Sequence, residues 1–230
     1  MKKVIFLFIF SFLLAFPIKN SNADIVLSKM ILDFLPKSPR QENLDVFNNG
    51  EDIDYISTKI FEIQNPGMKN QKRVEVSKGS KDRLVIAPNK LSIAPKARKR
   101  FQFIITDENL KKDKIYRVEV VPNIAGVQNP EGGIGIKILV GYEVLVIVRP
   151  QKMDFNLKVV RGKDSITFTN KGNTNILLSD IKHCDSKNVC KTILADRLYA
   201  GNEITAKLIY NDKPVIAEMY YGDEFKKETY

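Results

Sequence analysis

Residues 134–148 alternate apolar side chains at every second position, and this stretch constrains the fold more than any other. A period of two is that of a β-strand, because successive side chains point to opposite faces of a sheet. At roughly 3.3 Å per residue the stretch would span about 50 Å, far beyond a usual strand. It is therefore either bent between two sheets of its own chain or offered in part to another chain. The apolar face consists of Ile134, Ile136, Ile138, Val140, Tyr142, Val144, Val146 and Val148.

Short runs of β-branched and aromatic residues fill the rest of the chain and predict an all-β fold. Before Arg149-Pro150 they lie near 25–34, 44–47, 55–63, 72–76, 84–86, 101–105 and 115–121. After it they lie near 153–160, 165–169, 174–181, 193–198, 203–210 and 215–221. Pro150 cannot donate to a sheet ladder, so a central strand should stop there. We therefore predict two antiparallel β-sandwiches in series, an N-terminal domain at 24–149 and a C-terminal domain at 150–230.

Residues 1–23 have the pattern of a cleavable export signal. Lys2 and Lys3 precede an apolar run at 4–16 that only Ser11 interrupts, and small residues occupy the last and third-last positions of Ser21-Asn22-Ala23. The apolar run of 13 residues is too short for a membrane span of about 20. We expect cleavage after Ala23, export from the cytoplasm and no insertion into a membrane.

The two cysteines, Cys184 and Cys190, enclose a polar, turn-like stretch of five residues. Export to an oxidising compartment favours a local disulfide between them. The alternative is a metal site that also uses His183, the only histidine of the chain. Two thiolates and one imidazole are one ligand short of a usual zinc site, so we expect the disulfide and no metal or other cofactor.

Two functional classes are poorly supported by the residues present. A single histidine beside a cysteine does not favour a Ser-His-Asp or Cys-His catalytic arrangement, and no complete dinucleotide or phosphate-binding motif occurs. The chain has 37 Lys+Arg against 27 Asp+Glu, and its basic run at 96–100 invites a nucleic-acid interpretation. That run lacks interleaved aromatic residues and lies between Pro95 and the strand at Phe101. We therefore predict neither an enzyme nor a nucleic-acid-binding protein.

A series of short motifs runs through both predicted domains. They are Leu84-Val85-Ile86-Ala87-Pro88 with Leu91, Ile93 and Pro95; Tyr116-Arg117-Val118-Glu119-Val120 with Pro122; the alternating strand ending in Arg149-Pro150; Phe168-Thr169-Asn170-Lys171-Gly172-Asn173; and the Cys184–Cys190 loop followed by Tyr199-Ala200-Gly201. In order and spacing they resemble the PapD-like superfamily of periplasmic pilus (fimbrial) chaperones, and within it most the EcpB-type chaperones. The resemblance implies two immunoglobulin-like β-sandwich domains in a boomerang arrangement.

The same resemblance implies a function in the periplasm. Chaperones of this superfamily bind fimbrial subunits by donor-strand complementation, a known case of strand addition, and deliver them to an outer-membrane usher. Self-association could also shield the strand in the free protein. The alternative function is a secreted two-domain adhesin or structural pilus component, for which a long strand buried within its own chain would suffice.

The resemblance also assigns roles to individual residues. Ile136, Ile138 and Val140 match the side chains that fill the groove of a fimbrial subunit, and Ile134 extends the row. The superfamily holds the carboxyl terminus of its cargo with a first-strand arginine and a last-strand lysine, but the lysine position here is Leu145. The candidates for the carboxylate anchor are Lys29 first, then Arg117 and Lys137, and those for the hinge between the domains are Arg149 and Pro150.

Overall fold

The computed structural model describes residues 25–77, 84–107, 109–123, 139–210 and 212–230, and these contain strands and no helix. The strands before Pro150 are β1 (Ile25–Leu27), β2 (Ile31–Phe34), β3 (Gln41–Asn48), β4 (Asp54–Gln64), β5 (Lys72–Glu75), β6 (Leu84–Ala87), β7 (Lys90–Ile93), β8 (Arg98–Ile105), β9 (Lys114–Pro122) and β10 (Tyr142–Val148). Those after it are β11 (Leu157–Arg161), β12 (Ser165–Asn170), β13 (Ile176–Cys184), β14 (Cys190–Leu198), β15 (Glu203–Lys207), β16 (Val215–Tyr221) and β17 (Glu224–Thr229).

The first ten strands form a sandwich of two sheets. One sheet has the order β1-β3-β8-β6, and the other has the order β2-β10-β9-β4-β5 with β7 also pairing with β4. Alternate residues of the central strands point into the space between the sheets, as a period of two requires. The core they form is fully buried at Phe101, Phe103, Val118 and Val120.

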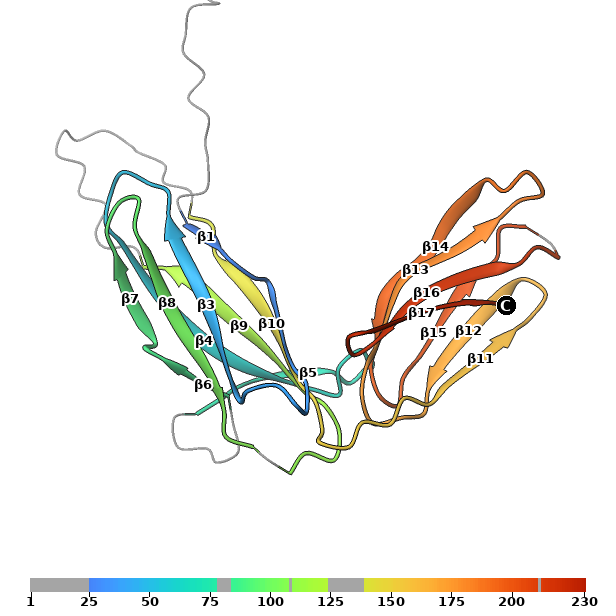
Figure 1. Ribbon diagram of the computed structural model, residues 1–230, viewed down its shortest axis with the longest axis horizontal. Helices are drawn as coiled ribbons and strands as arrows, with labels where there is room; N and C mark the ends of the chain where they lie inside the picture. Colours follow the sequence, from blue (N-terminus) through green and yellow to red (C-terminus); the bar gives the residue numbers. More distant parts are fainter. Residues whose placement is uncertain (1–24, 78–83, 108, 124–138, 211) are drawn as a thin grey trace, which may run out of the picture.

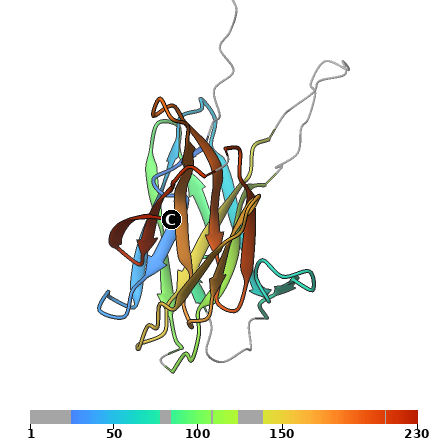
Figure 2. The ribbon, with the colours of Figure 1, turned by 90° about the vertical axis from the view of Figure 1, so that its right-hand side faces the viewer.

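The last seven strands form a second sandwich with its own core. Its sheets have the orders β11-β12-β15 and β14-β13-β16-β17. Phe168, Ile176, Leu178 and Met219 are fully buried between them. The two sandwiches meet at one end and diverge into an open V, as Figures 1 and 2 show from two sides, so the predicted all-β boomerang is confirmed. No helix of the described residues is long and apolar enough to cross a membrane.

The structure differs from the sequence prediction near residues 25–34, where one strand was expected and two are found. β1 pairs antiparallel with β3 in one sheet, whereas β2 pairs parallel with β10 in the other. Ser28 is still bonded to β3, because its amide donates to Asp45 O and its Oγ accepts from Asp45 N. The chain is thereby held to β3 as far as Ser28 and then crosses to the second sheet.

The long alternating stretch also differs from its prediction. Strand β10 begins only at Tyr142, residues 139–141 lie outside any strand, and residues 134–138 lie outside the described part of the chain. Val144, Val146 and Val148 point into the core as predicted, but Leu145 and Ile147 on the opposite face are buried as well. The predicted apolar face therefore holds for the second half of β10, and the strand is buried on its opposite face as well, at Leu145 and Ile147.

The basic run at 96–100 leads into β8, and its cations lie beside acidic side chains of the same domain. Arg100 Nε donates to Asp45 Oδ1 at 2.7 Å, and Arg98 lies 3.7 Å from the same carboxylate. Lys96 Nζ is 3.0 Å from Glu51. These contacts fit the interpretation of the run as a charged turn and strand entry.

Candidate functional site

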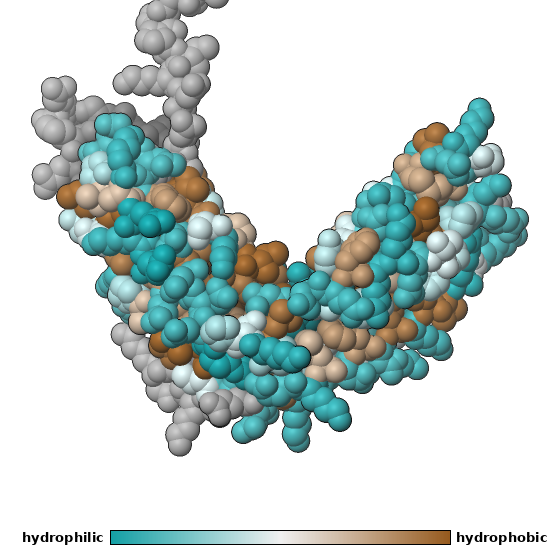
Figure 3. All heavy atoms as spheres, in the orientation of Figure 1, coloured by the Kyte–Doolittle hydropathy of each residue, from teal (hydrophilic) through white to brown (hydrophobic). Residues whose placement is uncertain are grey.

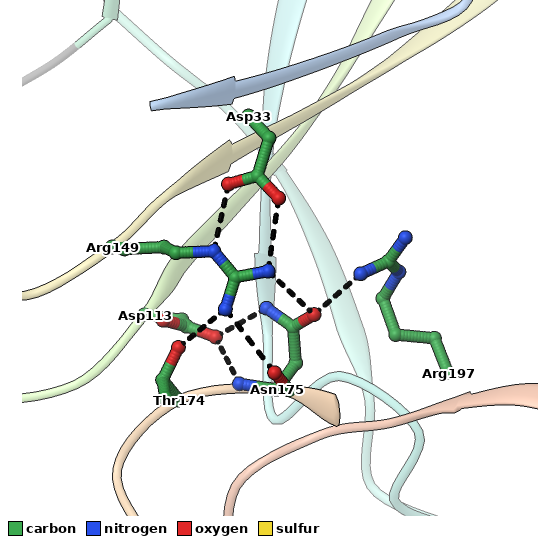
Figure 4. A network of polar contacts seen from close by, with 6 residues as sticks. All are labelled: Asp33, Asp113, Arg149, Thr174, Asn175 and Arg197. Carbon is green, nitrogen blue, oxygen red and sulfur yellow. Dashed lines mark hydrogen bonds and ion pairs between the residues drawn. The ribbon is translucent and has the colours of Figure 1, made fainter. Parts of the chain in front are cut away.

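The two sandwiches are joined through Arg149, whose side chain is 1% exposed. Its guanidinium donates to both carboxylate oxygens of Asp33 in β2, at 2.7 and 2.9 Å. It also donates to Thr174 Oγ1 at 2.7 Å and to the backbone oxygen of Asn175 at 3.1 Å, which belong to the second sandwich (Figure 4). A buried cation is tolerable only when it is fully paired, so these bonds fix the two domains to each other.

Asp113 extends the junction from the loop before β9. Its Oδ2 accepts a hydrogen bond from Asn175 N at 2.6 Å, and the Asn175 side-chain amide also donates to it. Burial raises the pKa of Asp113, although the hydrogen bonds from Asn175 and the charge of Arg149 act in the opposite direction. Arg197 of β14 donates to Asn175 Oδ1 from the other side (Figure 4). The junction is thus a continuous polar network with members from both domains.

A second tie joins the β4–β5 hairpin to the turn between β14 and β15. Asn202 Nδ2 donates to Pro66 O at 2.7 Å. Gly67 has φ +75°, and a Cβ there would lie 2.5 Å from Asn202 Nδ2 and 3.2 Å from Tyr199 Cδ2. Only glycine allows this backbone conformation without strain and this close approach at once. The angle between the sandwiches is therefore held at two separate places.

Tyr199 covers the second face of β10. It packs against a small apolar cluster made of Ile63, Ile115, Leu145 and Ile147, which lies on the outside of the first sandwich. This contact explains why Leu145 and Ile147 are buried although they point away from the main core. Above this cluster the two walls diverge and leave an open cleft (Figure 3).

Charged side chains lie beside this apolar cluster, on the cleft wall that β9 and β10 form. Arg117 lies directly across from Leu145 in the ladder between β9 and β10. Its nearest carboxylate among the described residues is Glu143, at 3.9 Å, and its side chain is 36% exposed. Arg73 takes the stronger contacts, with Glu119 at 2.6 Å and with Glu143. Arg117 is therefore a cation on the cleft wall with unused hydrogen-bonding capacity.

No family model matches the chain. One curated relative, a CFA/I fimbrial protein of Escherichia coli that is named as a subunit, is 27% identical over 178 residues, which cover 74% of this chain and 72% of that protein. Among solved structures, the class 5 fimbriae chaperone CfaA is 20% identical with a TM-score of 0.67, over 89% of this chain and 98% of that chain. A complex of the SafA pilin with the SafB chaperone from Salmonella enterica matches at 11% identity and a TM-score of 0.63, over 92% and 97%.

The chain has the fold of the PapD-like fimbrial chaperones. The resemblance predicted from the motifs is confirmed at this level, and so are the two immunoglobulin-like sandwiches. The EcpB-type subgroup within the superfamily stays a prediction.

Lys29 is paired with a carboxylate of its own sandwich. It lies between β1 and β2, and its Nζ is 2.9 Å from Glu42 Oε2 of β3. That pair is exposed and therefore weak, but it occupies the ammonium group with a carboxylate of its own chain. Lys29 is the first anchor candidate from the sequence. Its side chain is 48% exposed, against 36% for Arg117, but a carboxylate lies within hydrogen-bond distance of Lys29, whereas Glu143 lies 3.9 Å from Arg117.

The candidate strand residues are described only in part. Val140 is 48% exposed and precedes β10 without belonging to a strand. Ile134, Ile136, Ile138 and Lys137 lie outside the described residues, as does the whole predicted export signal at 1–23.

The predicted disulfide is confirmed, because Cys184 and Cys190 are joined with their sulfurs 2.06 Å apart. The metal alternative is wrong, because both thiols are used in this bond. His183 points into the second sandwich with 0% exposure, and its Nδ1 accepts hydrogen bonds from the amides of Ile209 and Tyr210. Among the described residues no group of three or more His, Cys, Asp or Glu could hold a metal ion.

Sequence reasoning missed the partners of Arg149. Asp33 is separated from it by 116 residues, and Asn175 by 26. Asp33 carries a weak signal, because it is the one charged residue within the short apolar strand β2. Arg197 and Asp113 carry no signal that separates them from ordinary surface charges.

Proposed function

We propose that this chain is a periplasmic chaperone that binds and stabilises fimbrial subunits by donor-strand complementation. The observation that carries the proposal is the cleft itself: two sandwiches are held at a fixed angle by the Arg149 network, and β10 runs along one wall. The structural relatives support it, since one was solved with a pilin and another as a chaperone–tip adhesin complex. A binding role of this kind requires no catalytic residues and no cofactor.

The row Ile134, Ile136, Ile138 and Val140 supplies the side chains that enter the groove of the bound fimbrial protein. Each buried aliphatic side chain contributes about 1.5–3 kcal/mol before ordering costs are subtracted. Four such side chains would suffice for a stable complex. The exposed Val140 at the described end of this row supports the proposal, because 48% of this apolar residue stays uncovered by the described residues.

Arg117 becomes the first candidate for binding the terminal carboxylate of the cargo. It lies across from Leu145, the position at which the superfamily has its lysine, and its nearest carboxylate among the described residues is 3.9 Å away. A guanidinium can bind a carboxylate through two parallel hydrogen bonds, which a lysine cannot. Lys29 and Lys137 remain second candidates, while Arg149 and Pro150 act at the hinge.

The same proposal includes the domain limits 24–149 and 150–230 and the delivery of cargo to an outer-membrane usher. It also includes self-association of the free chain and export with cleavage after Ala23. The export step is tested by amino-terminal sequencing of the protein recovered from periplasm, which should begin at Asp24. A protein that retains residues 1–23 would contradict it.

The main test is co-expression of the tagged chain with the small exported proteins encoded beside it, followed by native mass spectrometry of the periplasmic fraction. We expect a one-to-one complex with a protein that is degraded or aggregates when expressed alone. Ile138→Asp should abolish this complex while leaving the melting temperature unchanged, because it places a charge in an apolar groove. The matched control is Val160→Asp, at a residue that is 50% exposed on the outer strand β11, and it should capture normally.

A second candidate function is a structural pilus component, which the name of the Escherichia coli relative, a fimbrial subunit, favours. The same experiment separates the two. A long homopolymer of this chain would support the pilus component, whereas a stable monomer without any partner would favour a secreted adhesin. Either result would overturn the chaperone proposal.

A further inference from the structure

Two glutamates lie directly opposite each other on the outer face of the first sandwich. Glu119 of β9 and Glu143 of β10 are partners in the ladder between these strands. They point away from the core, because their sequence neighbours Val118, Val120 and Val144 point into it. Like charges directly across a ladder destabilise a sheet, so this pair requires a cation nearby.

Arg73 supplies that cation from β5, the edge strand of the same sheet. Its Nη2 donates to Glu119 Oε1 at 2.6 Å, and its Nη1 donates to Glu143 Oε1. The guanidinium also lies over the ring of Phe61, with Cζ 4.0 Å from the ring centroid. Stacking on an aromatic face and pairing with carboxylates are both typical of arginine, and together they hold the planar group in place. One arginine therefore binds an oxygen of each glutamate.

Arg117 lies next to this group without being hydrogen-bonded to it. It belongs to the next row of the sheet, between Phe61 of β4 and Leu145 of β10. Its Nε is 3.9 Å from Glu143 Oε2, whereas Arg73 contacts the other oxygen of that carboxylate. The distance is too long for a hydrogen bond, which needs about 3.2 Å or less. A small rotation of either side chain would be enough to form one.

The charges of these four side chains cancel, and the balance depends on Arg73. While Arg73 is in place, Glu143 has a closer cation than Arg117. Without Arg73 the group would carry one excess negative charge, and Glu143 would be left to pair with Arg117. The remaining carboxylate, Glu119, would repel an incoming anion. Arg73 therefore determines whether Arg117 is available to a ligand.

We propose that Arg73 positions the carboxylate anchor: it holds Glu119 and Glu143, and thereby leaves Arg117 able to bind the terminal carboxylate of the fimbrial cargo. This inference rests on the proposed function and deepens it, because it names the residue that controls the anchor. Arg73 is a positioning residue, since it acts through Glu143 and not by contact with the cargo. The competing explanation is that Arg73 itself binds the cargo, and the experiments distinguish the two.

The first test uses the free chain, labelled with nitrogen-15. The NMR signal of an arginine Nε–Hε group reports its hydrogen bonding, and the Arg117 signal is identified by its loss in Arg117→Ala. We expect Arg73→Ala to shift this signal and to slow its exchange with water, because Glu143 then pairs with Arg117. Adding Glu143→Gln to Arg73→Ala should return the signal toward its wild-type position. An Arg117 signal that is the same in wild type and Arg73→Ala would overturn the inference.

The second test is a competition in the periplasm between two differently tagged chains for a limiting amount of the exported protein that co-purifies with wild type. Arg73→Ala should hold about three- to fivefold less of it than wild type, because an exposed ion pair then competes with the cargo for Arg117. Adding Glu143→Gln should restore capture.

Lys59→Ala is the matched control for net charge. Lys59 lies across from Glu119 in the ladder between β4 and β9, but among the described residues the ion pair of Glu119 is with Arg73. Lys59→Ala removes the same charge from the same wall and should compete about as well as wild type. A loss equal to that of Arg73→Ala would show that only the net charge matters, and would overturn the inference.

The remaining outcomes separate this inference from the proposed function. Melting curves should show each variant folded, and Arg73→Gln replaces Arg73→Ala if the latter melts early. If Glu143→Gln does not restore capture, or if Arg73→Ala lowers capture equally in an Arg117→Ala background, Arg73 acts without the anchor and the inference is wrong, while the chaperone proposal stands. Failure of wild type to capture any exported protein would overturn both.

Discussion

The junction between the domains and the cleft wall each contain an arginine, but the chain pairs the two charges very differently. Arg149 is 1% exposed and donates to Asp33, Thr174 and Asn175. Arg117 is far more exposed and has only a 3.9 Å contact with Glu143 among the described carboxylates. A buried guanidinium has to find its partners within the chain, whereas an exposed one can bind a ligand. Arg149 therefore fixes the angle between the two domains, whereas Arg117 is available to bind a ligand.

The largest effect is expected from Arg149→Ala, which should break the hinge. The substitution leaves Asp33 without its cation and removes the bond to Thr174, so unfolding should become easier by about 3–5 kcal/mol. Urea unfolding measures this loss, and small-angle X-ray scattering should show a broader range of shapes. Arg149→Lys should recover only part of it, because lysine cannot make the bidentate contact. An unfolding free energy equal to that of wild type would show that the network does not hold the domains.

A smaller effect is expected at the second tie, from Gly67→Ala. The positive φ and the close contact with Asn202 should cost about 1–3 kcal/mol and loosen the β4–β5 hairpin from the C-terminal domain. The matched control is Gly162→Ala, where the added Cβ would meet only an ordinary contact at 3.5 Å. If scattering shows the same shape for Gly67→Ala and wild type, the Arg149 network alone fixes the angle.

Arg117→Ala should lower binding without affecting stability, which is the opposite of the result expected for Arg149. Loss of a charge-assisted hydrogen bond should reduce capture of the fimbrial cargo by about tenfold. Unfolding should change by less than about 0.5 kcal/mol, because the side chain is exposed. Lys29→Ala is the comparison, and we expect a smaller loss because Lys29 already contacts Glu42. A larger loss for Lys29→Ala would return the anchor role to the first strand.

The smallest effect concerns Asp113 and depends on pH. Burial raises the pKa of this carboxyl in the folded protein, so the folded state binds the proton more tightly than the unfolded state. Stability from this group should therefore fall as pH rises from the ordinary aspartate value through the raised one. Asp113→Asn should remove this dependence, and urea unfolding at several pH values in that window measures the difference. A pH dependence identical in wild type and variant would show that Asp113 does not titrate in this range.

Much of the fold was predictable because its signals are local. Alternating residues in β8 and β9 point inward as their period of two requires, with Phe101, Phe103, Val118 and Val120 fully buried. The disulfide was predictable because Cys184 and Cys190 are six positions apart, across a short polar turn. The candidate site was only partly predictable, since Arg149-Pro150 marks the junction but its partners lie far away in the sequence.

The sequence by itself determined the β-class and the resemblance to fimbrial chaperones, because periodicity and short motifs act over neighbouring residues. Only the tertiary structure decided that Leu145 and Ile147 are buried on a second face, since the covering Tyr199 comes from the other domain. The tertiary structure likewise decided that Arg149 is buried and paired at the junction, whereas Arg117 is exposed on the cleft wall. The physical reason is that burial and charge pairing depend on which distant segments meet, and no local pattern encodes that meeting.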